Sequence, residues 1–437
     1  MNLIAPSLQR VAASFLMAGV LQVAILTADA ASFFPRADRV HQEALLVDGH
    51  NDITSVMLDS GFDLGDRGDH ADGIVYDFKN PQAPRAGQKF RTQTDLRRMK
   101  QGGVDAQFFS IYVNARSLNR KPSEGGGPAR RALDMIDSLA RQVAKHSDEM
   151  EMARSVADIR RIVRRDKIAA LMGLEGGYAI EDSLAVLRTF HQLGIRYMTL
   201  THTDSTDWAD SSGDFNNPDV RHHDGLTDFG REVVREMNRL GMMVDISHVA
   251  DATFWDVLET TRSPVIASHS SCRALANHPR NLTDEMLRAL GTNGGIIMLN
   301  FADEFVDQRV VDFKKQMREF ESAAQKKYPE DPEKARAECQ AYYSTNYPRP
   351  PVSLLVNHIE HVVKVAGIDH VGLGSDFDGE IRPPIGLEDV ACFPRITASL
   401  AQRGYSDGDI KKVLGENLLR VMAAVEAVGE ARVERLE

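Results

Sequence analysis

Residues that can bind a metal ion or transfer a proton recur in this sequence at the ends of short apolar runs. Buried strands of a parallel sheet are normally apolar along their whole length, so a histidine or carboxylate at such an end is costly unless it has a role. Neutral imidazoles combined with carboxylates suit zinc better than calcium or magnesium. The residues at such ends that could bind metal or move a proton are His50, Asp52, Glu175, His202, His248, His269 and Asp376.

The spacing within this set favours two metal ions. His50 and Asp52 are two residues apart, so both side chains leave the same side of a strand and can approach one ion. That pattern alone is common by chance, and His248 or His269 taken singly is more often a satisfied core or loop histidine. Glu175 follows an apolar run, and its two oxygens can bridge two cations. Together, these five residues predict a site for two zinc ions.

A pair of zinc ions also predicts the nucleophile. Two such ions about 3.5 to 4 Å apart can hold a water molecule between them and bring its pKa to about 7. A metal-bridging hydroxide would then be available at neutral pH without a nucleophilic serine. The sequence has no G-x-S-x-G motif, so we predict that Ser268, Ser270 and Ser271 support His269.

The elements that must bring these residues together form a repeat of strands and helices. Short runs rich in Val, Ile, Leu and Met alternate with segments of helical periodicity, which is typical of β-α units around a parallel sheet. Two such helices, 184–193 and 229–240, are followed directly by Gly194 and Gly241, which stop helices. The eight predicted strands cover residues 45–52, 104–113, 168–175, 195–202, 242–248, 264–269, 294–301 and 370–376.

Eight strand-helix units favour an α/β fold of the closed (β/α)8 TIM barrel type. An open doubly wound sheet remains the alternative. In a barrel the carboxyl ends of all strands open on one face. The polar residues at these ends would therefore converge, although more than 320 residues separate His50 from Asp376.

Two segments fall outside the repeat. Residues 61–90 are dense in Gly, Asp and Pro and predict a long loop after the first strand, at the edge of the site or over it. Residues 311–351 are strongly charged, with an amphipathic helix over 313–327 and several prolines after it. We expect this insertion before the eighth strand to be a solvated decoration or a dimer contact.

Composition limits the classes of partner. The chain has 437 residues, 43% of them apolar, and its 52 basic and 63 acidic residues give a net charge of −11. This charge argues against nucleic acid and against anionic membranes as partners. Only three cysteines are present, so no disulfide framework is predicted, and Cys272 is expected to be a small buried or loop residue.

The first thirty residues differ from the rest. Arg10 precedes an apolar run over 11–27, and Ala28-Asp29-Ala30 supplies small residues for cleavage. These features predict a secretory signal peptide over 1–30, a single metallohydrolase domain over 31–437 and a periplasmic location. An N-terminal membrane anchor is the alternative, although the run is shorter than the roughly 20 residues a span needs. No lipid-anchor signal is seen at the other end, so we expect no stable membrane attachment.

Several phrases of the sequence, in order, resemble those of the membrane (renal) dipeptidases, peptidase family M19, within the amidohydrolase-like superfamily. The resemblance extends over most of the chain and implies a barrel of the metal-dependent hydrolase type. The matching phrases are Val47-Asp48-Gly49-His50-Asn51-Asp52, Gly173-Leu174-Glu175-Gly176-Gly177, Leu200-Thr201-His202, Trp208-Ala209-Asp210, Asp245-Ile246-Ser247-His248, Ser268-His269-Ser270-Ser271, Arg280-Asn281, Gly374-Ser375-Asp376-Phe377-Asp378-Gly379 and Glu416-Asn417-Leu418-Leu419-Arg420.

The resemblance assigns a role to each polar residue. It implies that His50 and Asp52 bind one zinc ion, that the two later histidines of the set, His248 and His269, bind the other, and that Glu175 bridges them.

For the remaining groups, the resemblance implies that His202 polarises the scissile carbonyl and steadies the oxyanion. Asp376 would carry a proton to the departing amine. Arg280 would bind the C-terminal carboxylate of the substrate, for which a planar guanidinium is suited. Asp378 is expected to be structural support.

The resemblance has limits. Mammalian members have disulfides and a lipid anchor that are absent here, so membrane attachment and covalent dimerisation are not transferred, and a homodimer stays open. Members carry a tyrosine in the substrate pocket after the seventh strand, where this chain has Asn300-Phe301-Ala302. The preferred side chains are therefore not predicted.

The expected activity is hydrolysis of dipeptides, including those with a C-terminal D-residue, by a di-zinc enzyme. One alternative is another amidohydrolase with the same metal centre, such as a lactonase, a cyclic amidase or a phosphoesterase. A second is a non-catalytic binding protein that retains the barrel. The intact set of ligands together with Asp376 argues against the second alternative.

Overall fold

The centre of the molecule is a closed barrel of parallel strands. The computed structural model describes residues 35–71, 73–76, 89–115 and 126–433, so the predicted signal peptide over 1–30 lies outside the described residues. The pairing of β2 with β4, from Ala106 with Ala169 to Tyr112 with Glu175, closes the sheet and excludes the open alternative. The barrel strands are β1 (Leu46–Asn51), β2 (Val104–Tyr112), β4 (Ile168–Glu175), β5 (Ile195–Thr199), β6 (Met243–Asp245), β7 (Ile266–Ser270), β8 (Ile296–Leu299) and β9 (Val371–Leu373).

One short strand, β3 (Met150–Met152), lies outside the predicted set. It pairs with the first residues of β4, from Met150 with Ile168 onward, on the side where β5 pairs further along. The three residues Met-Glu-Met are too few for their alternation of apolar and polar side chains to predict a strand.

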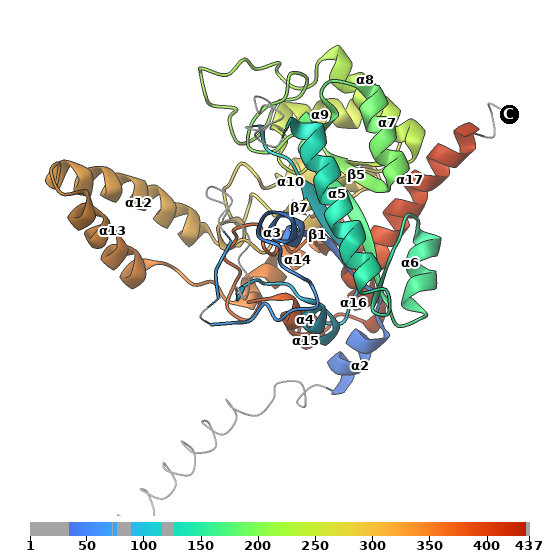
Figure 1. Ribbon diagram of the computed structural model, residues 1–437, viewed down its shortest axis with the longest axis horizontal. Coiled ribbons are helices and arrows are strands. Elements are labelled where there is room, and N and C mark those ends of the chain that lie inside the picture. The colour runs from blue at the N-terminus through green and yellow to red at the C-terminus, as the bar shows by residue number, and fades with distance from the viewer. Residues whose placement is uncertain (1–34, 72, 77–88, 116–125, 434–437) are drawn as a thin grey trace, which may run out of the picture.

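Helices surround the barrel, as Figure 1 shows. The predicted helix 184–193 is α7, and the predicted helix 229–240 is α8, which begins one residue earlier. Gly194 (φ 116°) and Gly241 (φ 72°) end them in the left-handed conformation. The helices before the insertion are α2 (Pro35–Glu43), α3 (Ile53–Ser60), α4 (Leu96–Gln101), α5 (Pro128–Lys145), α6 (Val156–Val163), α7 (Leu184–Leu193), α8 (Asp228–Leu240), α9 (Asp251–Thr260), α10 (Asp284–Thr292) and α11 (Asp303–Val306).

The insertion forms a helical hairpin of α12 (Gln308–Lys327) and α13 (Pro332–Asn346). The predicted helix over 313–327 is thus too short, because Asp307 caps the helix and accepts a hydrogen bond from the backbone of Arg309. The second helix was not predicted. Pro332, taken as an interruption, occupies its first turn after the capping residue Asp331, where proline needs no N–H partner.

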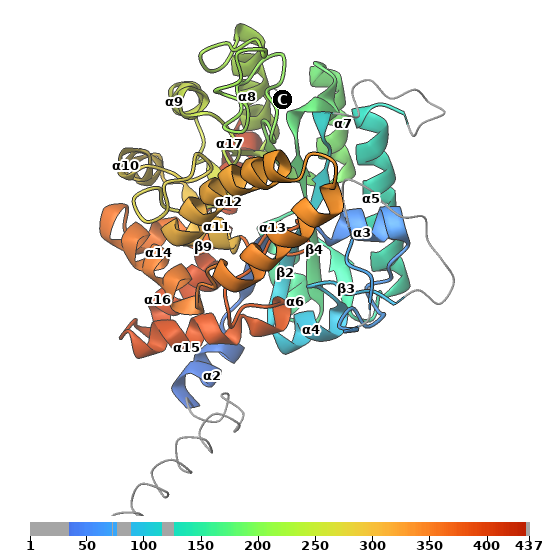
Figure 2. The same ribbon diagram turned by 90° about the vertical axis from the view of Figure 1, so that its left-hand side faces the viewer.

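This hairpin projects from the body of the protein in Figure 1 and lies in front of the barrel in Figure 2. Its two helices are held together by stacked rings, with Tyr342 centred 4.2 Å from Phe320 and 6.0 Å from Phe313. The chain then returns to the barrel through α14 (Val352–Val365) and finishes with α15 (Pro394–Gln402), α16 (Asp407–Lys411) and α17 (Asn417–Val433).

The barrel interior is filled by alternate residues of the strands. Ala106 and Phe108 of β2, and Ala169 and Leu171 of β4, are fully buried in one apolar cluster that continues onto α6 and α17. A second, larger cluster lies between the strands and the surrounding helices. Within the described residues, no helix combines the length and apolar character needed to cross a bilayer. The three cysteines are unpaired, and Cys272 is buried as predicted.

Candidate metal centre

The site begins where the inward-facing positions of the strands change from apolar to polar. Side chains alternate along a strand, so Ser110 follows Phe108 on the inner face of β2, and Glu175 follows Leu171 at the end of β4. The Ser110 hydroxyl donates to Glu175 Oε2 over 2.9 Å. The upper end of the barrel core is therefore a buried polar layer.

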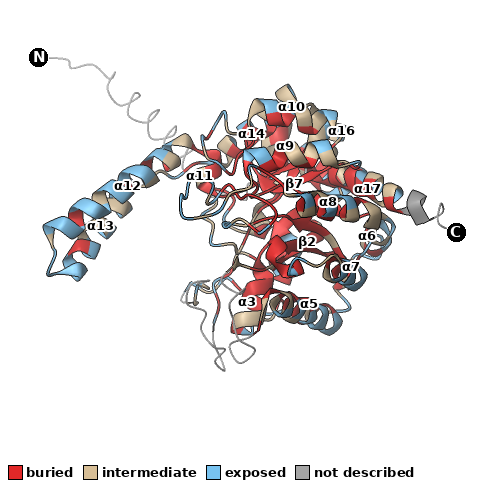
Figure 3. Ribbon diagram, turned by 90° about the horizontal axis from the view of Figure 1, so that it is seen from above, coloured by how far each residue is buried: buried red, intermediate tan, exposed pale blue. Residues whose placement is uncertain are grey.

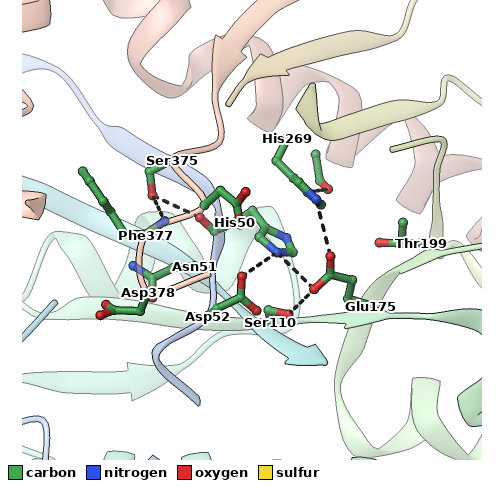
Figure 4. A network of polar contacts seen from close by, with 12 residues as sticks. His50, Asn51, Asp52, Ser110, Glu175, Thr199, His269, Ser375, Phe377 and Asp378 are labelled. Atoms are coloured by element: carbon green, nitrogen blue, oxygen red, sulfur yellow. Dashed lines mark hydrogen bonds and ion pairs between the residues drawn. The ribbon is translucent and has the colours of Figure 1, made fainter. Parts of the chain in front are cut away.

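The carboxylate of Glu175 is the centre of this layer. Its Oε2 lies 3.3 Å from His50 Nε2, which is itself 3.4 Å from Asp52 Oδ2. Its Oε1 lies 3.2 Å from His248 Nε2 and 3.4 Å from His269 Nε2. In Figure 4 the labelled side chains of His50 and His269 point toward Glu175, and that of Asp52 points toward His50. Each carboxylate oxygen thus faces a separate group of nitrogen and oxygen donors.

Two observations fit this cluster to metal ions. First, His50 Nε2 and Asp52 Oδ1 are buried without a hydrogen-bond partner. Second, the other nitrogen of His50 is held, because Nδ1 lies 2.8 Å from the Tyr197 hydroxyl, which donates to the carbonyl of Gly49 over 3.2 Å. His50 Nδ1 must then be the donor, and the lone pair of Nε2 is directed to the centre.

His269 is held in the same tautomer by a different relay. Asp245 Oδ2 accepts from the Ser268 hydroxyl over 2.6 Å, and the Ser268 oxygen lies 2.7 Å from His269 Nδ1. Ser268 therefore accepts from Nδ1, which leaves Nε2 free to bind a cation. This confirms the predicted support of His269 by Ser268. The position of Asp245 is fixed in turn by the Thr199 hydroxyl over 2.6 Å.

Electrostatics agree with a cation at the centre. Burial lowers the pKa of His50, but Tyr197, Glu175 and Asp52 outweigh this effect and raise it well above the usual value. A metal cation would experience the same negative surroundings as that proton. Burial lowers the pKa of His269 well below the usual range, so this imidazole is neutral, as a ligand must be.

Three of the predicted strands end three residues earlier than expected, and this corrects the placement of three residues. His202, His248 and Asp376 lie three residues beyond the ends of β5, β6 and β9. His248 (φ 70°) and Asp376 (φ 63°) have left-handed backbones, which cannot continue a strand. Non-glycine residues in this conformation are held by their surroundings, and they concentrate at functional sites.

His202 completes the layer from the side of the second histidine group. Its ring is centred 4.2 Å from that of His248 and 4.7 Å from that of Tyr112, and its Nε2 lies 3.7 Å from Glu175 Oε1. Burial lowers the pKa of His202. The side chain keeps 20% exposure, so it faces the pocket and not only the cluster.

Asp376 lies on the opposite side of the cluster. It belongs to a group with His50 and His269 whose ligand atoms lie within 4.8 Å of one another. Asn300 donates to Asp376 Oδ2 over 2.8 Å. Burial, followed by the nearby charge of Asp52, raises the pKa of Asp376 well above its usual value. Its carboxylate therefore accepts a proton readily. Asp378, two residues on, accepts from the backbone of Gln93, consistent with a structural role.

Arg280 lies at the base of the pocket. It donates to the carbonyl of His269 over 3.1 Å and to the Ser270 hydroxyl over 3.3 Å, and its guanidinium covers the ring of Phe305 at 5.3 Å. Ser270 therefore contacts Arg280 and does not support His269, in contrast to the prediction. Burial lowers the pKa of Arg280 to about 10, so the group is still a cation at neutral pH.

These residues open into one pocket of about 660 Å³. Lys314 of α12 and Tyr343 of α13 line it, together with Tyr347 just after α13. The interpretation of the insertion as a solvated decoration or dimer contact is therefore incomplete, because these three residues of the insertion form a wall of the pocket. The only signal in the sequence was the density of tyrosines near the end of this segment.

Other residues that position the site were missed because each is buried in a strand or loop with no distinctive spacing. Asp48, for example, accepts from the Ser375 hydroxyl over 2.6 Å and from Gln107 over 3.0 Å, which ties β1 to the loop that carries Asp376. A carboxylate inside the first apolar run was the available signal.

Comparison with known proteins agrees with this geometry. The family model described as membrane dipeptidase, peptidase family M19, matches residues 34–435. The chain is 36% identical over 387 residues to a dipeptidase, tcpJ, of Claviceps purpurea (strain 20.1), covering 88% of this chain and 78% of that protein.

Two solved structures are similar over most of their length. The probable dipeptidase PvdM from Pseudomonas aeruginosa has a TM-score of 0.74 and 26% identity, covering 92% of this chain and all of that one (100%). A metallo peptidase from Rhodobacter sphaeroides, liganded with a phosphinate mimic of the dipeptide L-Ala-D-Ala, has a TM-score of 0.65 and 25% identity, covering 87% and 99%. The chain therefore belongs to the membrane dipeptidase family, peptidase family M19, and is a metal-dependent dipeptidase on a (β/α)8 barrel.

Proposed function

We propose that this protein is a di-zinc dipeptidase that hydrolyses the single peptide bond of dipeptides, including those with a D-residue at the C-terminal position. The observation that carries the proposal is the division of the Glu175 carboxylate, one oxygen toward His50 and the other toward His248 and His269, at the base of a pocket that also contains Arg280. This arrangement suits two cations and one short peptide with a free C-terminal carboxylate.

The donors divide into two sets. His50 and Asp52 would hold one zinc ion, His248 and His269 the other, and Glu175 would contribute to both. Nitrogen and carboxylate oxygen without thiolate is a common donor set of catalytic zinc. When bound, the ions supply Lewis-acid polarisation of the carbonyl and a water molecule with a lowered pKa.

The remaining residues of the pocket handle the substrate. Arg280, still charged and fixed by two hydrogen bonds, binds the C-terminal carboxylate. His202 lies beside Glu175 with part of its ring exposed, where it can donate to the carbonyl oxygen as negative charge develops. Asp376 has a raised pKa, so it takes the proton released by the attacking water and passes it to the departing amine.

Acceptance of D-residues is supported by the ligand of the similar Rhodobacter sphaeroides peptidase, a mimic of L-Ala-D-Ala. A periplasmic location is proposed from the composition of residues 1–30 alone.

Metal analysis of the purified protein combined with activity assays tests the proposal. We expect two equivalents of zinc per chain and turnover of L-Ala-L-Ala and L-Ala-D-Ala, with little turnover of a lactone or a phosphotriester. Activity restricted to the non-peptide substrates would contradict the dipeptidase assignment. One tightly bound ion in a fully active enzyme would contradict the di-zinc assignment.

A further inference from the structure

Arg382 is a second arginine that lines the pocket, and its surroundings differ from those of the buried Arg280. It follows the loop of Asp376, and its guanidinium lies over two rings of the insertion, 4.5 Å from the centre of Tyr347 and 5.1 Å from the centre of Tyr343. Among the described residues, no hydrogen bond or ion pair joins this guanidinium to another side chain. Arg280, in contrast, is committed to a carbonyl and a hydroxyl.

The support of Arg382 is rigid. The Tyr347 hydroxyl donates to Asp303 Oδ2 over 2.6 Å, and the backbone N–H of Asp303 donates to the carbonyl of Arg382 over 2.9 Å. Asp303 thus holds both the ring of Tyr347 and the backbone of Arg382. The centres of the two rings are 4.5 Å apart, so both rings lie on the same side of the guanidinium. Its N–H groups remain for an acceptor in the plane, which is the geometry that a carboxylate offers.

No carboxylate among the described residues forms an ion pair with this group. Glu304 lies 2.8 Å from Lys314 Nζ, so these two charges of the wall are paired with each other. The Asp303 carboxylate accepts from Tyr347 and attracts Arg382 electrostatically, but no hydrogen bond or ion pair joins the side chains of Asp303 and Arg382. The cation on this wall that lacks a carboxylate partner among the described residues is Arg382.

We propose that Arg382 is a specificity residue that binds the side-chain carboxylate of an acidic residue, so that the preferred substrates are dipeptides containing Asp or Glu. The inference rests on the proposed dipeptidase function, with Arg280 binding the C-terminal carboxylate. A pocket of about 660 Å³ has room for a dipeptide that reaches both arginines. A dicarboxylate dipeptide places one anion at each.

The test compares matched acid and amide substrates, Ala-Glu with Ala-Gln and Glu-Ala with Gln-Ala, using the zinc-loaded full-length enzyme. We expect kcat/KM to favour the acid by about tenfold in one of the two pairs, through KM, as for a charge-assisted hydrogen bond. In Arg382→Gln this ratio should fall to about 1. Arg382→Lys should keep part of it, because the charge remains without the planar fork.

Lys327→Gln is the matched control, since it removes a cation of the same hairpin that is paired with Glu338 and does not line the pocket, and it should keep the ratio of the wild type. Metal content and melting temperature of each variant show whether the wall is intact. A ratio near 1 in the wild type for both pairs, or an unchanged ratio in Arg382→Gln, overturns the inference while the dipeptidase function stands. Absence of turnover for all dipeptides, Ala-Ala included, overturns the proposed function and this inference with it.

Discussion

The metal cluster and the insertion wall form one pocket but are built in different ways. Glu175 and His50 are at most 3% exposed and are tied to the barrel strands by hydrogen bonds. Tyr343 and Tyr347 come from the insertion and Arg382 from the connection after β9, and all three keep part of their surface in solvent. Figure 3 shows the same contrast, with a buried barrel centre and a largely exposed α12–α13 hairpin.

The difference indicates that the metal cluster carries out the chemistry and that the insertion wall selects the substrate. Groups that hold metal must stay within a few tenths of an ångström of their positions, and a buried barrel end provides this because each ligand has a fixed partner behind it. A wall supplied by a surface insertion can change without disturbing the cluster. Changes in the cluster should therefore alter metal binding and turnover, whereas changes in the wall should alter KM.

The largest effect is expected for Glu175→Gln. The substitution removes a negative charge shared by both groups of donors, so metal binding should be lost and kcat/KM should fall by at least about 10⁴-fold. Metal content per chain and turnover of Ala-Ala measure this. Glu360→Gln, at a surface ion pair with Arg403, is the control and should retain both. A fully loaded and active Glu175→Gln enzyme would refute the central place of this carboxylate.

Asp376→Asn should separate the proton transfer from metal binding. We expect kcat to fall by about 10²- to 10³-fold because an amide cannot carry the proton. Zinc content should stay at the level of the wild type. Asp378→Asn, in the same loop but bonded to Gln93, should lose much less. Persistent hydrolysis by Asp376→Asn would show that another group carries the proton.

Asp245→Asn tests whether the residue behind a ligand matters as the contrast predicts. It weakens the relay through Ser268 to His269, so the affinity for zinc should fall by about 10- to 100-fold. Competition with a chelator measures the dissociation constant. Asp251→Asn, which alters an exposed pair with Arg273, is the matched substitution and should leave the affinity unchanged. Equal affinities in both variants would count against the relay.

The smallest effect is expected in the wall. Tyr347→Phe removes the hydroxyl that donates to Asp303. Loss of this hydrogen bond should weaken substrate binding by about 1 kcal/mol, which would be measured as a rise in KM of a few fold. Metal content and kcat on Ala-Ala should not change. Loss of zinc from this variant would show that the wall and the cluster are coupled, and would contradict their separate roles in substrate selection and metal binding.

Much of the barrel was predictable because its strands and helices follow from local patterns in the sequence. Helix α7 and strand β4 have the predicted bounds, since apolar periodicity and capping glycines act over a few residues. The ends of β5, β6 and β9 were predicted three residues too far, because the sequence pattern does not mark where each strand stops. After β6 and β9 the backbone turns left-handed at His248 and Asp376. Helix α13 was missed because Pro332, in its first turn, was taken as a break.

The sequence by itself determined the types of donor and their positions near strand ends, since side-chain chemistry and period are local properties. The tertiary structure alone decided which imidazole nitrogen of His50 and His269 faces the centre, because Tyr197 and Ser268 are brought behind them by closure of the barrel. It also decided that Tyr347 reaches the pocket, because the position of an insertion depends on packing between segments that no local pattern encodes.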